Sequence, residues 1–395
     1  TSRATATRLR DAIALRLGVP TTGPLARTAN SLAFEVVRDA ARRAGAQPPR
    51  LVTGGEQDSD LEALLEGHVE EGTGPAWPDF LGPEVRGLRR FRNELRELMM
   101  RATEHEVPPA RLRELGASLG RPEWVAAADF IAEYDETVSN YREVQYDAAE
   151  LARFAVAAIE SDEPGERVAA LRLVVVDDLQ EATESTLALL RALAGRGVAV
   201  IGFGDPDVAA NAFRGGEPDA LGRLSAVLGV PGLTTLTLAT SYRQGPALRA
   251  LTSAITSRIG AAAAGTQRAA AAGAQDADVP IARIEATSPA REWATIARAL
   301  RQEHLEHDVP WSAMVVVVRS GAQIPVVARS LALAEVPTRT SIGGTALRDD
   351  AAARGLLTLV DVGIGGVELD LQRATDLLLS PYGGLDRLSL RRLRL

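Results

Sequence analysis

The chain has 395 residues, of which 46% are apolar and 24% are charged, so it can bury the cores of about two or three domains. It contains no cysteine, which excludes disulfide frameworks, thiolate metal sites and cysteine nucleophiles. All 44 basic residues are arginine, so no lysine binds phosphate or forms a Schiff base. The formal net charge of −8 argues against a protein coated in positive charge for nucleic acid, yet leaves room for a local basic groove.

The sequence offers no segment that predicts a membrane or secreted protein. No apolar run approaches the roughly 18 residues that span a bilayer, and residues 1–10 carry three arginines with no apolar stretch of signal-peptide type behind them. We therefore expect a cytoplasmic protein without a membrane partner.

From Leu61 to about Glu160 the apolar spacing is helical, which predicts a helical subdomain inserted into the chain. An apolar stripe and an adjacent charged stripe mark one of its helices: Leu88, Phe91, Leu95 and Leu98, and Arg89, Arg92 and Arg96. The arginines either follow the phosphates of a duplex or form a solvated face, and the pattern favours the solvated face.

Four short segments rich in β-branched residues predict parallel strands that are buried on both faces: 171–176, 198–203, 233–238 and 314–318. Helical periods fill the gaps between them, so we expect an α/β fold with a parallel sheet. The stretch 259–277 has no apolar side chain larger than alanine after its first residue, which predicts a helix end followed by a mobile loop.

Two carboxylates, Asp177 and Asp178, follow directly on the strand that ends at Val176. This arrangement is typical of a Walker B motif at the carboxyl edge of a sheet, where open α/β folds bind their ligands. One carboxylate can hold hydrated Mg²⁺ and the next can orient or deprotonate water. The alternative is a plain helix N-cap, which an isolated acidic pair favours.

Polar residues also follow the next two strands. Residues 204–207 form a tight turn, and Phe213 and Arg214 come after it as an aromatic and a cation suited to a base and a phosphate. The alternative is a turn with a buried phenylalanine. Tyr242 and Arg243 follow the strand at 233–238, and an arginine there can reach a γ-phosphate.

The segments VVVDDLQEA, GDPDVAANAFRGG and TSYRQGPAL resemble, in this order, motifs II, III and IV of the superfamily 1A DNA helicases of UvrD, PcrA, Rep and RecB type. The segments TSRATATRLRDAIALRLG and LARTANSLAFEVVRDA resemble motifs Ia and Ib. LVTGGEQDSDLEALLEG and SPYGGLDRLSLRRLRL are similar to parts of the actinobacterial AdnAB helicase-nucleases, which resect double-strand breaks.

The resemblance implies a RecA-like, parallel-sheet P-loop NTPase helicase core with two RecA-like subdomains and a helical insertion. The implied ranges are 1–50 with 148–240 for the first subdomain, 51–147 for its insertion, 241–365 for part of the second subdomain, and 366–395 for the start of a further insertion. The phosphate loop and motifs V and VI of the family are not among these residues, so we expect a motor truncated at both ends.

The resemblance also implies roles for single residues, with ATP and Mg²⁺ as cofactors. Asp177 would hold Mg²⁺ through water and Asp178 would be the residual base. Gln180 would couple the nucleotide to motif III, while Arg243, beside Tyr242, would be the arginine finger. Contacts to single-stranded DNA are expected from the following side chains: Arg3, Thr28, Ser31, Phe213 and Arg214. Asp205 and Asp207 are expected to order the motif III turn by capping its amides.

The implied function is that of an ATP-dependent 3′–5′ helicase in break resection, which binds single-stranded and duplex-end DNA and pairs with a second helicase-nuclease subunit. Five positions depart from the family: Asp178 replaces a glutamate, Val208 a glutamine and Asn211 a tyrosine, and Ala29 and Asn30 stand where motif Ib usually has an aromatic residue and a histidine. These changes leave open a weakened, DNA-binding scaffold subunit. An unrelated α/β nucleotide-binding module is a more remote alternative.

Overall fold

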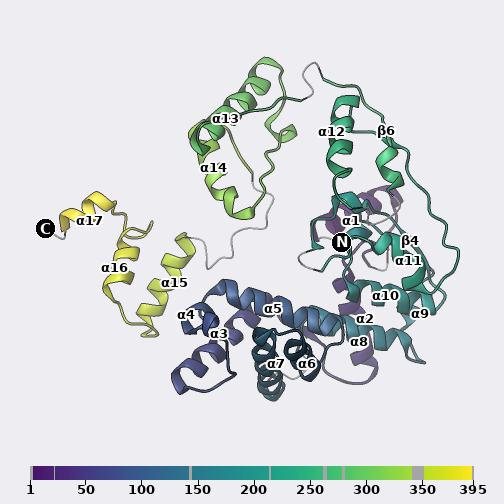
Figure 1. Cartoon of the computed structure of the whole chain (residues 1–395), viewed down its shortest axis with the longest axis horizontal. Coiled ribbons are helices and arrows are strands. Elements are labelled where there is room, and N and C mark those ends of the chain that lie inside the picture. Colours follow the sequence, from purple (N-terminus) through teal and green to yellow (C-terminus); the bar gives the residue numbers. More distant parts are fainter. Residues whose placement is uncertain are drawn as a thin grey trace. The chain divides into compact units, whose positions relative to one another are not determined.

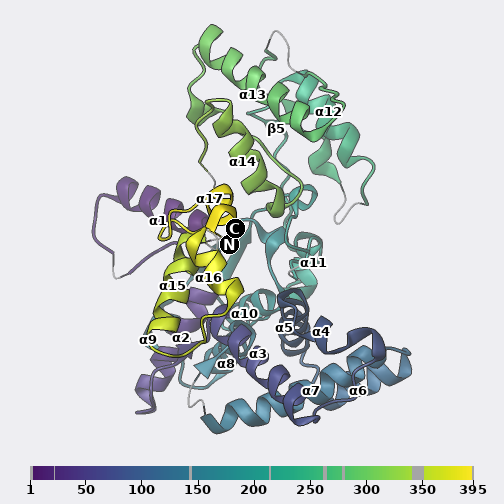
Figure 2. The ribbon, with the colours of Figure 1, turned by 90° about the vertical axis from the view of Figure 1, so that its left-hand side faces the viewer.

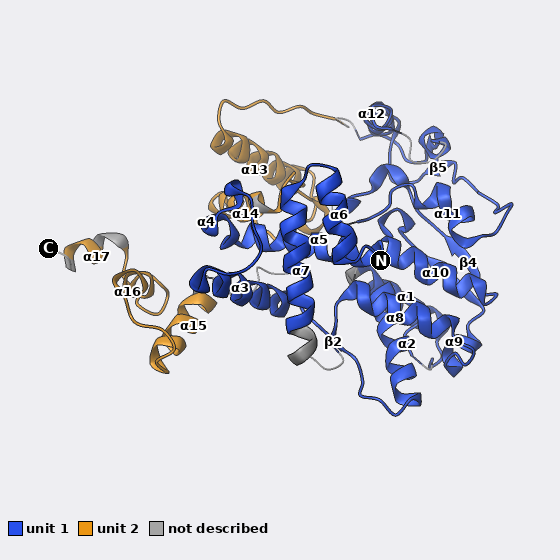
Figure 3. Ribbon diagram, turned by 60° about the horizontal axis from the view of Figure 1, so that its bottom comes forward, with its two compact units in different colours: residues 1–280 blue, residues 281–395 orange. Residues whose placement is uncertain are grey.

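The structure is a computed structural model that describes residues 3–21, 23–141, 145–212, 215–260, 265–277, 281–339 and 351–393. The chain divides into two compact units, Thr1–Pro280 and Ile281–Leu395, coloured blue and orange in Figure 3. Each unit is described by itself. Among the described residues, every helix is too short or too polar to cross a bilayer.

Unit 1 contains both helices and parallel strands (Figure 1). Its helices are α1 (Arg3–Leu17), α2 (Ala29–Arg43), α3 (Gly54–Glu71), α4 (Pro83–Arg86), α5 (Arg89–Glu104), α6 (Pro109–Ser118), α7 (Pro122–Tyr141), α8 (Ala148–Glu160), α9 (Glu166–Ala170), α10 (Glu184–Gly195), α11 (Ala220–Leu228) and α12 (Pro246–Thr256). Short 3-10 turns are η1 (Asp79–Leu81), η2 (Leu179–Glu181), η3 (Pro206–Val208) and η5 (Thr266–Ala269). The strands are β1 (Arg50–Leu51), β2 (Gln145–Tyr146), β3 (Leu173–Val176), β4 (Ala199–Gly202), β5 (Thr240–Ser241) and β6 (Ala271–Ala272).

The described strands pair in parallel as β1–β2, β3–β4 and β5–β6. The predicted strands at 171–176 and 198–203 are confirmed, with bounds that match β3 and β4 closely. Parallel pairing agrees with the α/β class. The structure does not by itself show a core of two RecA-like subdomains, and the four domain ranges remain predictions.

The first core of unit 1 is formed by helices α2, α8 and α10, which pack against one another next to the β3–β4 sheet. Helix α8 starts with a reciprocal cap in which the Asp147 carboxylate accepts the Glu150 amide and the Glu150 carboxylate accepts the Asp147 amide. The apolar faces of these helices meet at fully buried residues: Leu151, Ala155, Ile159 and Leu193.

The helices between β1 and β2 have a core of their own, built around the fully buried Phe130. Helices α6 and α7 lie side by side in it (Figure 2). The prediction that the arginines form a solvated face is wrong for Arg92, which is buried. Its guanidinium pairs with the carboxylates of Asp58 at 3.1 Å and Glu62 at 2.9 Å. Arg92 stands three residues before the buried Leu95, so the inner face of α5 includes it.

One face of the β3–β4 sheet is covered by α10 and α11, which pack on the inward side chains of Val174, Val176 and Val200. The other face is open: Leu173 is 48% exposed and Val175 is 55% exposed. The prediction that these strands are buried on both faces is therefore wrong for the described residues. Alternate residues of a strand point to opposite faces, so a layer on one side leaves every second side chain exposed.

Two of the four predicted strands are not strands. Residues 233–238 and 314–318 are irregular, because neither pairs with another described segment. Leu236, Leu238, Val315 and Val317 are consequently exposed. The prediction of a loop at 259–277 is also wrong at 266–269 and 271–272, where η5 and β6 lie and β6 pairs with β5, and the mobility of this stretch stays a prediction.

Unit 2 has only helices and turns among its described residues. They are α13 (Pro289–Glu306), η6 (Trp311–Ala313), η7 (Gly321–Gln323), α14 (Ile324–Leu333), α15 (Ala351–Gly363), α16 (Leu371–Leu378) and α17 (Arg387–Leu393). Its buried core is small and lies between α13 and α14, at Ala297, Val327, Leu331 and Val336.

Candidate functional site

The candidate site is built on the carboxyl ends of β3 and β4. Val176 lies opposite Gly202 in the parallel register, and the backbones stay bonded beyond the strands. The Phe203 amide donates to the Val176 carbonyl at 2.8 Å, and the Leu179 amide donates to the Phe203 carbonyl at 2.8 Å. The polar residues after both strands are thus held side by side, as expected for adjacent parallel strands.

The two carboxylates after β3 differ in their surroundings. Asp177 is exposed and has no hydrogen bond or ion pair within the described residues. Asp178 is half-buried and takes the left-handed conformation, with φ of 52° and ψ of 49°. Aspartate adopts this conformation more readily than most residues. Helix α10 is capped by Thr183, and Asp178, at the N-cap position of η2, makes no side-chain capping hydrogen bond to that turn, so the N-cap alternative is wrong for Asp178.

Gln180 joins the two polar segments. The residue is 2% exposed, and its Oε1 accepts the backbone N–H of Asp205 at 3.1 Å. Gly204 leaves room for this contact, since a Cβ there would collide with Gln180 Oε1. The buried amide therefore ties the segment after β3 to the turn after β4.

A second connection between these segments was missed by sequence reasoning. The carboxylate of Glu181 accepts the N–H of Ala210 at 2.7 Å through Oε1 and the N–H of Asn211 at 2.9 Å through Oε2. Both oxygens are used by adjacent amides, which fixes the backbone after η3. In the sequence, only the position of Glu181 directly after Gln180 could have indicated this role. An acidic residue in a short turn is ordinarily read as a side chain exposed to water.

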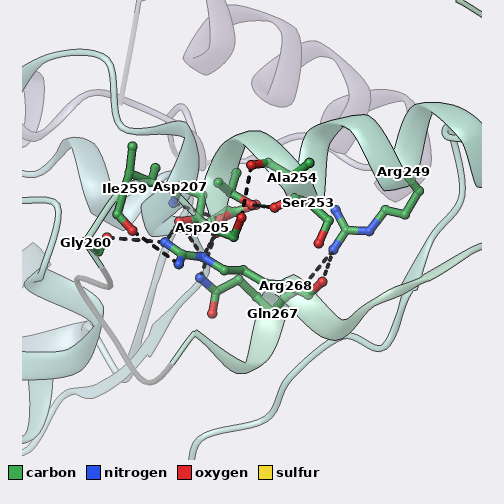
Figure 4. A network of polar contacts seen from close by, with 11 residues as sticks. Asp205, Asp207, Arg249, Ser253, Ala254, Ile259, Gly260, Gln267 and Arg268 are labelled. Atoms are coloured by element: carbon green, nitrogen blue, oxygen red, sulfur yellow. Dashed lines mark hydrogen bonds and ion pairs between the residues drawn. The ribbon is translucent and has the colours of Figure 1, made fainter.

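The two aspartates of the turn after β4 have different roles. Asp205 Oδ1 accepts the N–H of Asp207 at 3.0 Å, which confirms the expected capping role for Asp205. Asp207 instead bonds the side chains of Arg268 and Gln267 (Figure 4). The hydrogen bonds from Arg268, with a smaller effect from Gln267, hold the pKa of Asp207 below its usual value.

Tyr242 and Arg243 come directly after β5, and both are exposed. The side chain of Arg243 has no hydrogen bond or ion pair within the described part of the chain. No bond joins it to Asp177 there. That both residues face one nucleotide stays a prediction.

The residues expected to contact DNA are only partly within the described structure. Phe213 and Arg214 lie outside the described residues, as does the side chain of Arg3. Thr28 caps α2 by accepting the Ser31 amide at 3.2 Å, and Ser31 itself is exposed.

Arg101 is a residue near these positions that sequence reasoning did not single out. It lies on α5 with its guanidinium against Gly215, where the backbone has a φ of 82° and leaves no space for a Cβ. Arg101 also pairs with Glu104 at 2.8 Å, and burial raises the pKa of Glu104. The helices inserted between β1 and β2 thus contact the segment that follows β4.

The side chains at the site are better suited to bind Mg²⁺ than to bind a metal ion that is coordinated only by protein atoms. Among the described residues, no three histidines or carboxylates lie close enough together to hold an ion. Magnesium ordinarily uses one or two carboxylates, several waters and the phosphates of its substrate, and the exposed Asp177 carboxylate suits that role.

Comparison with known proteins agrees with this arrangement. The family model of the UvrD/REP helicase N-terminal domain matches residues 1–226, which is more than half of the chain. No curated protein matches the chain closely enough to count as a relative. The matched residues include the strands β3 and β4 and the polar segments that follow them. The chain therefore belongs to the UvrD/REP helicases, a family of DNA helicases with a RecA-like α/β fold.

Proposed function

We propose that the chain is the motor portion of an ATP-dependent 3′–5′ DNA helicase that resects double-strand breaks in DNA repair, as one subunit of a helicase-nuclease of AdnAB type. UvrD-like helicases in general use ATP and Mg²⁺. The observation that carries the proposal is the junction after β3 and β4, where the exposed Asp177 stands three residues before Gln180 and Gln180 bonds the Asp205 amide.

The proposed nucleotide site combines five side chains. Asp177 holds Mg²⁺ through water, and Asp178 positions the attacking water and accepts its proton. When bound, Mg²⁺ neutralises charge on the phosphates. Arg243 stabilises negative charge on the γ-phosphate, and Tyr242 stands beside it. Gln180 transmits changes at the nucleotide to the turn after β4, because its amide bonds that turn directly.

The proposed DNA track runs over the residues predicted from motifs Ia, Ib and III: Arg3, Thr28, Ser31, Phe213 and Arg214. Single-stranded DNA would stack on Phe213, and Arg214 would neutralise a phosphate. The second RecA-like subdomain from residue 241 onward, the 3′–5′ polarity and the second subunit are parts of the same proposal and rest on the resemblance.

The first test is ATP hydrolysis by the full-length protein with its partner motor inactivated. Asp177→Ala should abolish hydrolysis by this motor, because only Asp177 holds the metal. Asp178→Glu should raise the rate, since one more methylene moves the carboxylate by about 1 Å and such a displacement can change a rate on the order of a hundredfold. Asp162→Ala, which removes an exposed carboxylate elsewhere in unit 1, should leave the rate unchanged.

The second test is binding of a short single-stranded oligonucleotide, measured by fluorescence anisotropy at several salt concentrations. Phe213→Ala should weaken binding by roughly 1–3 kcal/mol with an unchanged salt slope, because stacking carries no charge. Arg214→Ala should flatten the slope by about one unit. If neither variant alters binding, the proposed DNA track is wrong.

A scaffold subunit with a decayed nucleotide site is the second candidate. Val208, which stands where the family has a glutamine, is an apolar side chain that is 59% exposed and cannot hydrogen-bond to a phosphate. Equal hydrolysis by wild type, Asp177→Ala and Asp178→Glu, together with intact DNA binding, would favour this candidate over the motor.

A further inference from the structure

A nearly buried ion pair links two segments of unit 1 that lie 61 residues apart (Figure 4). Arg268 Nε donates to Asp207 Oδ2 at 2.9 Å, and Arg268 Nη2 donates to Asp207 Oδ1 at 2.5 Å. Gln267 Nε2 adds a bond to Asp207 Oδ2 at 3.1 Å. The side chain of Asp207 is 7% exposed and that of Arg268 is 18% exposed. A two-pronged pair with little contact to water resists rotation better than a single exposed bond.

The guanidinium of Arg268 also reaches the segment that follows α12. Its Nη2 donates to the carbonyl of Gly260 at 3.2 Å, and its Nη1 donates to the carbonyl of Ile259 at 3.4 Å. On the other side, Asp207 is held in the turn after β4 by its own amide, which donates to Asp205. Arg268 therefore bonds the turn after β4 and the segment that follows α12 at the same time.

The turn η5, which carries Arg268, is attached to the strand that leads to Arg243. In the β5–β6 pair, Thr240 lies opposite Ala271 and the Gly273 amide donates to the Ser241 carbonyl at 2.9 Å. Arg249 of α12 fastens the same turn by donating to backbone carbonyls of Gln267, Arg268 and Ala270. Hydrogen bonds therefore connect the turn that carries Arg268 to the backbone just before Arg243.

We propose that Arg268 is a positioning residue that couples the turn after β4 to Arg243 through Asp207, so that ATP hydrolysis responds to DNA. The inference rests on the proposed function. Two segments that are bonded through one rigid pair move together, and loss of the pair lets each move alone. The alternative is an ion pair that stabilises the fold and has no effect on the reaction.

The test is Arg268→Gln in the full-length protein, with DNA-stimulated ATP hydrolysis as the readout. The kcat with single-stranded DNA should fall about tenfold, within the range typical of coupling between sites. The KM for ATP should change less than about twofold, because the variant disturbs the position of Arg243, whose contact with the γ-phosphate is proposed to act in the transition state rather than in the bound ground state. A purely structural pair would change thermal stability without this division between kcat and KM.

Two further variants sharpen the result. Arg258→Gln removes an exposed arginine from the same region, without a partner in the described residues, and should leave kcat unchanged. Asp207→Asn should lower kcat as Arg268→Gln does, and the double variant should be no worse than either single one, because both break the same pair. Additive losses, or an unchanged kcat in Arg268→Gln, would overturn the inference.

Amide hydrogen exchange separates this inference from the proposed function. Asp207→Asn should speed exchange at the Gly273 amide, which lies in the other segment and bonds Ser241. If the full-length protein shows no DNA-stimulated hydrolysis, the proposed function fails. In that case faster exchange at Gly273 still supports the mechanical link, and unchanged exchange there refutes it.

Discussion

The side chain of Gln180 passes close to the backbone at Gly204, directly after β4. A methyl group there would collide with Gln180 Oε1 and lie 2.9 Å from Leu221 Cδ1. Gly204→Ala should therefore break the hydrogen bond that the Asp205 N–H donates to Gln180 Oε1 and leave the buried side-chain amide of Gln180 without this partner. We expect a loss of about 1–3 kcal/mol in the free energy of unfolding, measured with urea.

Gly195 supplies the matched control, because a Cβ there meets nothing within 4 Å. Gly195→Ala at the end of α10 should be neutral or slightly stabilising. Equal stability of the two variants would mean that Gln180 does not depend on Gly204 for its position.

Asp135 on α7 gives the stability of the inserted helices a dependence on pH. Burial, and after it the charge of Asp147, raise the pKa of Asp135 from 3.8 to about 6. The folded state then binds its proton more tightly than the unfolded state, so this group favours folding at low pH and loses that effect as the pH rises from about 4 to about 6. Asp135 is exposed to water over much of its surface, and screening by water reduces the size of the effect.

Asp135→Asn should remove this contribution. Between about pH 4 and about pH 6 the contribution of Asp135 to the free energy of unfolding falls in wild type, and the variant should lack this fall. At neutral pH the variant should therefore be the more stable protein. Urea unfolding at a series of pH values measures both effects. Parallel curves for the two proteins would contradict the assignment of the shift to Asp135.

At the scale of elements, β3 is a strand with one covered and one open face. Val174 packs against both of the buried cores to which helix α10 contributes, whereas Val175 is more than half exposed. Val174→Ala should lower the free energy of unfolding by about 1–2 kcal/mol through the loss of buried methyl groups. Val175→Ala should change it by less than about 0.5 kcal/mol. An equal loss from both variants in urea titrations would show that the second face is covered in solution.

At the scale of the molecule, the cores of the two compact units share no residues. Three cores lie in unit 1 and one small core lies between α13 and α14 of unit 2. We therefore expect two transitions in calorimetry, with unit 2 unfolding first. Leu331→Ala should lower the free energy of unfolding of unit 2 alone and so shift only the first transition to lower temperature. Leu187→Ala should do the same for unit 1 and the second transition. Each loss should be about 2–5 kcal/mol. A single transition lowered by both variants would show that the units unfold together.

The sequence by itself determined β3 and β4, the helices between β1 and β2, and the polar segments after both strands. These features are encoded locally, by runs of β-branched residues, by helical spacing and by turn residues, so that a short window contains their cause. The same motifs, in their order along the chain, were sufficient to indicate the helicase family that the family model then matched.

Only the tertiary structure decided which polar side chains meet. The partners of Arg92 and of Arg268 lie far away in sequence, at Asp58 and Asp207, and no local pattern distinguishes these arginines from solvated ones. The open face of β3 and the failure of residues 233–238 and 314–318 to form strands have the same origin. A strand needs a neighbour to bond and a layer to cover it, and both are supplied by other parts of the chain.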